Sequence, residues 1–117
     1  MTYDARYAAQ VLEVTVRIPG ALLDLHYRHG LLVWLGALLR RFGREPATRA
    51  AIVTLAAQMT QTLQTHCEGG APRPVALLGA LEALVARLAD ATGEDTALGA
   101  DVARVRRDVA QLQAVTA

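Results

Sequence analysis

The sequence predicts an all-α protein, a compact up-down bundle of four to five helices, and three observations carry that prediction. Alanine and leucine, which are strong helix formers, account for 41 of the 117 residues. Apolar side chains recur at intervals of three and four residues in five segments, as they do on one face of a helix. Short stretches with glycine or proline separate these segments, and short loops favour antiparallel neighbours. We expect residues 1–117 to form one domain.

The first two predicted helices differ in how their apolar residues are distributed. The first covers residues 3–17 and ends at Pro19-Gly20. Its apolar stripe is Tyr7, Val11, Val14 and Ile18. The second covers residues 21–42 and stops at Gly43. Because it is apolar nearly all round between Leu31 and Leu39, it is predicted to be the central and most buried helix.

The remaining three predicted helices are amphipathic. The third covers residues 46–66 and starts at Pro46, since proline is favoured in a first helical turn. The fourth covers 74–91, between a loop at 68–74 and a break at 92–95. The fifth covers 96–115 and has a heptad seam, which needs a partner face inside the molecule or on a second chain. The seam, our candidate interface, is Leu98, Val102, Val105, Val109 and Leu112.

The composition excludes several classes of protein. An apolar content of 53% and a net charge of +1 exclude intrinsic disorder. The chain has no serine and no lysine, so neither can act in catalysis, and its single cysteine cannot form an internal disulfide. The longest apolar stretch is too short to cross a bilayer, which takes about 20 residues. No signal-peptide pattern opens the chain. We therefore expect a cytoplasmic protein that is not an enzyme and does not bind a membrane.

Histidine and cysteine side chains form one candidate site. His26 and His29 share a helix face, and antiparallel pairing of the second and third helices brings His66 and Cys67 to the same end of the bundle. Imidazole and thiolate would suit zinc or haem iron. No close ligand-spacing motif is present, so we expect no cofactor. A metal- or haem-binding bundle using His26, His66 and Cys67 remains the alternative function.

Arginine side chains form a second candidate site. Arg40, Arg41, Arg44 and Arg49 flank one predicted loop, and Glu45 is the only acid among them. Guanidinium groups at such a corner can hold phosphates, although a solvated basic helix end has the same pattern. On the fifth helix, Asp101 and Asp108 lie at helical spacing from Arg104, which predicts salt bridges.

A helix-turn-helix regulator is a further alternative, based on the second and third helices. Polar residues that could contact DNA lie late in the third helix, whereas recognition helices normally use their early residues. These residues are Thr60, Gln61, Thr62 and Gln64.

Part of the chain is similar to a known family. Tyr7-Ala8, Pro19, the run from His29 to Leu32, Leu35 and Leu38-Leu39 carry the likeness. They resemble the N-terminal half of the small all-helical subunit of type III CRISPR effector complexes, over about a third of the chain. The resemblance implies a non-catalytic subunit of a bacterial antiviral complex that stacks in a filament and lines a nucleic-acid path with arginines. The arginines of the corner would be the RNA contacts by position rather than by motif.

The leading hypothesis is therefore a non-enzymatic helical assembly subunit. Its partners would be other protein subunits or further copies of itself, and the resemblance adds an RNA backbone.

Overall fold

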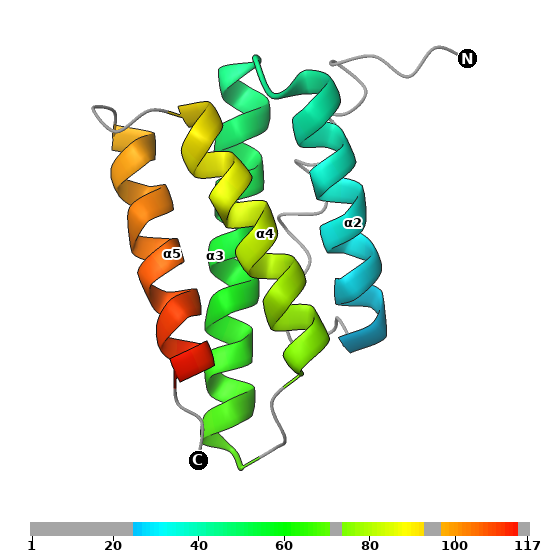
Figure 1. Cartoon of the computed structure of the whole chain (residues 1–117), viewed down its shortest axis with the longest axis vertical. Helices are drawn as coiled ribbons and strands as arrows, with labels where there is room; N and C mark the ends of the chain where they lie inside the picture. The colour runs from blue at the N-terminus through cyan, green and yellow to red at the C-terminus, as the bar shows by residue number, and fades with distance from the viewer. Residues whose placement is uncertain (1–24, 71–73, 93–96, 115–117) are drawn as a thin grey trace.

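The computed structural model describes residues 25–70, 74–92 and 97–114, and the surroundings of side chains from residue 30 onward. These ranges form four helices, α2 (Leu25–Phe42), α3 (Pro46–Glu68), α4 (Val75–Thr92) and α5 (Ala97–Ala114), and contain no strand (Figure 1). The all-α prediction is confirmed. The predicted first helix at 3–17 and the break at Pro19-Gly20 lie outside the described residues.

The ends of α3 follow from proline and glycine chemistry. Pro46 occupies the first turn, where its missing N–H costs no helical hydrogen bond. At the other end, Gly69 N–H donates to the carbonyl of Thr65 and Gly70 N–H to that of Cys67, each at 3.1 Å. Gly70 has a φ of 85°, which favours glycine and turns the chain out of the helix. The helix thus extends two residues beyond the predicted end at His66.

The four described helices alternate in direction, with α2 and α4 running one way and α3 and α5 the other (Figure 1). α3 and α4 occupy the middle and each pack along all three other helices, whereas α2 packs along α3 and α4. Among the four described helices α2 thus lies to one side, and the predicted central position of residues 21–42 also involves residues 1–24, which lie outside the described ones. The apolar run of α2 does not bury every face: the Val33 side chain is 62% exposed.

A single hydrophobic core joins the four helices. Leu35, Ile52, Leu63 and Leu81 are completely buried within it. At about 25 cal/mol per Å² of apolar surface removed from water, such side chains supply most of the favourable free energy of folding. None of the described helices combines the length and apolar character that crossing a bilayer requires.

Candidate functional site

The arginine corner, which we define as Arg40, Arg41, Arg44 and Arg49, surrounds the connection between α2 and α3 at one end of the bundle (Figure 1). Arg40 and Arg41 lie in the last turn of α2, where cations complement the negative end of the helix dipole. Arg44 lies in the connection and Arg49 in the first turn of α3. The structure thus brings all four residues of the predicted site to one corner.

The corner is tight because Gly43 follows α2 directly. A Cβ atom at this position would lie only 2.2 Å from the carbonyl oxygen of Leu39, so any other residue would force the backbone to move. The turn then closes with a 3.0 Å hydrogen bond from the N–H of Glu45 to the carbonyl of Phe42. Glycine at position 43 therefore sets the close approach of the two helix ends.

Arg49 acts within the protein rather than on its surface. Its Nη1 donates a 2.6 Å hydrogen bond to the carbonyl oxygen of Gly43, and the side chain is partly buried. Its Nε is buried without a hydrogen-bond partner among the described residues. This contact satisfies a carbonyl that the helix end leaves open. Arg49 therefore holds the start of α3 against the end of α2 and has less freedom to bind a ligand.

The other three arginines of the corner present their charge to solvent. Arg40, Arg41 and Arg44 are exposed, and within the described ranges none of them forms an ion pair with an acid. The guanidinium of Arg41 lies 5.5 Å from the centre of the Phe42 ring, a favourable cation–π distance. Glu45 is exposed beside them. Such a group can bind phosphates through paired N–H donors.

The predicted interface seam is buried inside this chain. Val102, Val105, Val109 and Leu112 are between 1% and 9% exposed and belong to the core, and Leu98 packs against it half-buried. α5 lies against α4 and α3. The sequence predicted that the seam packs either inside the molecule or against a second chain. In the structure it packs inside the molecule.

The histidine and cysteine residues are only partly described. His66 and Cys67 lie half-buried in the last turn of α3, and Cys67 packs against the core. The backbones of His26 and His29 lie in the first turns of α2, at the same end of the bundle, but their side chains lie outside the described ones (Figure 1). Among the described side chains, no three His, Cys, Asp or Glu residues gather to hold a metal.

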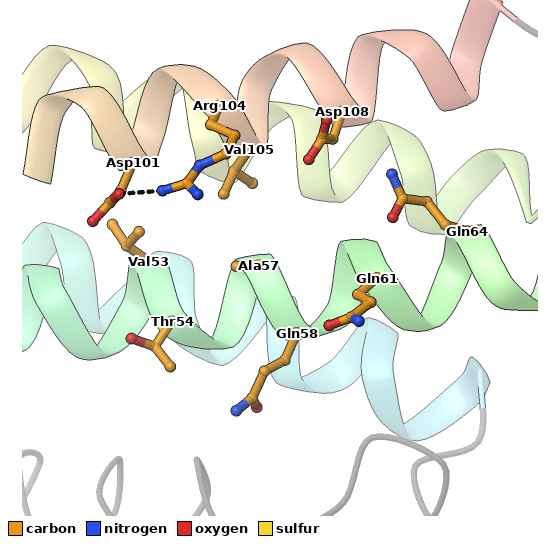
Figure 2. A pocket seen from close by; sticks show the side chains of 10 residues that line it. All are labelled: Val53, Thr54, Ala57, Gln58, Gln61, Gln64, Asp101, Arg104, Val105 and Asp108. Carbon is orange, nitrogen blue, oxygen red and sulfur yellow. Dashed lines mark hydrogen bonds and ion pairs between the residues drawn. The ribbon is translucent and has the colours of Figure 1, made fainter.

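A groove between α3 and α5, with a volume of about 460 Å³, was not predicted from the sequence. Val53 and Val105 are buried at its base, and Gln64 points from α3 toward α5 (Figure 2). Arg104 and Asp101 form an ion pair on its α5 side, as their spacing predicted. Because that pair is mutually neutralised and amides supply most of the other polar groups, the groove has no evident chemistry.

The polar residues considered for DNA contact do not share one exposed face. Thr60 is buried, and its hydroxyl donates to the carbonyl of Ala56 at 2.7 Å. Thr62 is half-buried and donates to the carbonyl of Gln58 at 2.9 Å. Gln61 and Gln64 line the groove beside α5.

The fold and the corner together define an all-α helical bundle with a cationic end. Comparison with protein-family models, with curated proteins and with solved structures found no match to this chain.

Proposed function

We propose that this chain is a non-enzymatic, cytoplasmic helical subunit of a larger assembly, and that its arginine corner contacts the backbone of a single-stranded RNA. The observation that carries the proposal is a set of three exposed guanidinium groups around one tight turn, those of Arg40, Arg41 and Arg44, none of which forms an ion pair with a described acid. The resemblance to the small subunit of type III CRISPR effector complexes supports the same kind of role in bacterial antiviral defence.

The corner and α5 differ in how far acids neutralise their arginines. On α5, Arg104 is paired with Asp101, so its charge is partly neutralised. At the corner, Glu45 is the only acid between residues 40 and 49. Arginine cannot lose its charge near neutral pH and offers a planar set of donors that fits phosphate oxygens. Phosphate contacts of this kind give affinity without sequence preference.

The test is a titration of a single-stranded RNA oligonucleotide at several salt concentrations. The variant Arg40→Ala/Arg44→Ala removes two charges and leaves Arg41 on the Phe42 ring. Arg106→Ala/Arg107→Ala removes two charges that are also exposed, from α5, and is the matched control. If both corner residues contact phosphates, the corner variant should lower the salt-dependence slope by about 1.4, since each contact to single strands contributes about 0.7.

The control variant should bind RNA as the wild type does. Equal affinity and equal slope for the two double variants would reject the corner as an RNA contact. Sedimentation of the wild type, with and without RNA, tests the assembly role separately. A monomer that binds no RNA would reject the whole proposal.

A further inference from the structure

We infer that Arg87 of α4 belongs to the same RNA-binding surface as Arg40, Arg41 and Arg44, and that it takes the place that the sequence analysis assigned to Arg49. This inference rests on the proposed function. It follows from where the structure directs the two side chains. Arg49 turns inward and donates to the carbonyl of Gly43, whereas Arg87 is exposed and reaches across to α2.

The position of the Arg87 guanidinium is given by its distance from Gly36. A Cβ atom on Gly36 would lie 3.7 Å from Nη1 of Arg87, so the guanidinium lies beside the space that a side chain at this position of α2 would occupy. Arg40 follows Gly36 by four residues and therefore lies on the same side of α2, one turn closer to the corner. Cβ atoms at this spacing are about 6 Å apart. The Arg87 guanidinium thus lies about one helical turn from the base of Arg40.

The packing of the helices agrees with this placement. α2 and α4 run in the same direction and pack against each other, and both end at the corner end of the bundle (Figure 1). Arg87 precedes the end of α4 at Thr92 by five residues, and Gly36 precedes the end of α2 at Phe42 by six. The two positions are therefore at nearly the same height in the bundle. At the corner end α4 leans toward α5 (Figure 1), so Arg87 would extend the cationic surface from the corner toward the middle of α2.

Within the described part of the chain, the Arg87 guanidinium has no ion-pair partner. The ion pair seen in the described part of the chain joins Arg104 to Asp101 and does not involve Arg87. Asp90 lies three residues after Arg87 on α4 and is exposed, so it is the nearest acid along that helix. Four guanidinium groups spread over α2, the connection after it and α4 suit consecutive phosphates of one strand better than a single small anion.

The experiment compares Arg87→Ala with Arg106→Ala in the same RNA titration. Both variants remove one exposed charge from the middle of a helix. Arg87→Ala should weaken binding and lower the salt-dependence slope by about 0.7, whereas Arg106→Ala should leave both unchanged. Arg87→Gln keeps most of the side chain that lies against Gly36 and should behave like Arg87→Ala. Asp90→Asn removes the neighbouring acid and should strengthen binding.

The outcomes separate this inference from the proposed function. If Arg40→Ala/Arg44→Ala weakens RNA binding but both Arg87 variants match Arg106→Ala, the inference is overturned and the proposed function stands. If Arg40→Ala/Arg44→Ala matches its α5 control, both fail. Thermal unfolding followed by circular dichroism should show equal midpoints for Arg87→Gln and wild type, so that a loss of binding reports the lost charge.

Discussion

α2 and α5 occupy opposite sides of the described bundle, yet they use their apolar residues differently. α5 has a narrow stripe, and four of its five seam residues are fully buried against the chain's own helices. α2 is apolar nearly all round, but Val33 remains 62% exposed and its last turn carries arginines to solvent. The comparison shows that a regular, narrow stripe locates a buried face better than overall hydrophobicity does.

The largest expected change in the free energy of unfolding distinguishes the buried face of α2 from its exposed face. Leu35 is completely buried, so Leu35→Ala should lower the free energy of unfolding by about 2–5 kcal/mol through lost burial and a cavity. Val33→Ala, two residues away on the exposed face, should change it by less than about 0.5 kcal/mol. Urea unfolding followed by circular dichroism measures both. Similar losses for the two variants would mean that Val33 is covered in solution.

The sequence predicted the fold better than it predicted the site. Helix ends at Phe42 and Pro46 and the heptad seam were predictable, because glycine, proline and apolar spacing act locally. The role of Arg49 was not, because its hydrogen bond to Gly43 depends on the angle of the turn. The approach of Arg87 to the Gly36 position brings together residues 51 positions apart, and no local pattern encodes it.

The next largest change in unfolding free energy is expected for the buried seam of α5. Val109 is 1% exposed, so Val109→Ala should cost about 1.5–3 kcal/mol of unfolding free energy from lost burial and imperfect repacking. Because the seam is satisfied within the chain, the sedimentation coefficient should not change. The exposed neighbour Ala110, replaced by Gln, provides a control with little expected effect. A change of oligomeric state in Val109→Ala alone would assign the seam to a second chain.

A smaller loss of stability is expected at Gly43, in the turn that follows α2 at the corner. Gly43→Ala places a Cβ atom against the carbonyl of Leu39, and we expect a loss of about 1–3 kcal/mol, as for other overpacking substitutions. Gly79→Ala is the matched control, since a Cβ at this position in α4 meets nothing within 4 Å. It should stabilise the protein by about 0.5–1 kcal/mol, because alanine is the better helix former. Relative to wild type, the midpoint of thermal unfolding should thus fall for Gly43→Ala and rise for Gly79→Ala.

The smallest expected change in unfolding free energy concerns the charged face of α5, which differs from the last turn of α2, where Arg40 and Arg41 have no ion pair with a described acid. Arg104 and Asp101 form an ion pair at helical spacing, but their side chains are 64% and 48% exposed. Solvent and salt screen such a pair, so a double-mutant cycle with Arg104→Ala and Asp101→Ala should give a coupling of about 0.2–0.5 kcal/mol. The cycle should be measured at low and at high salt, where the coupling should shrink. A coupling that exceeds about 1 kcal/mol, or that salt does not reduce, would mean that the pair is shielded from water in solution.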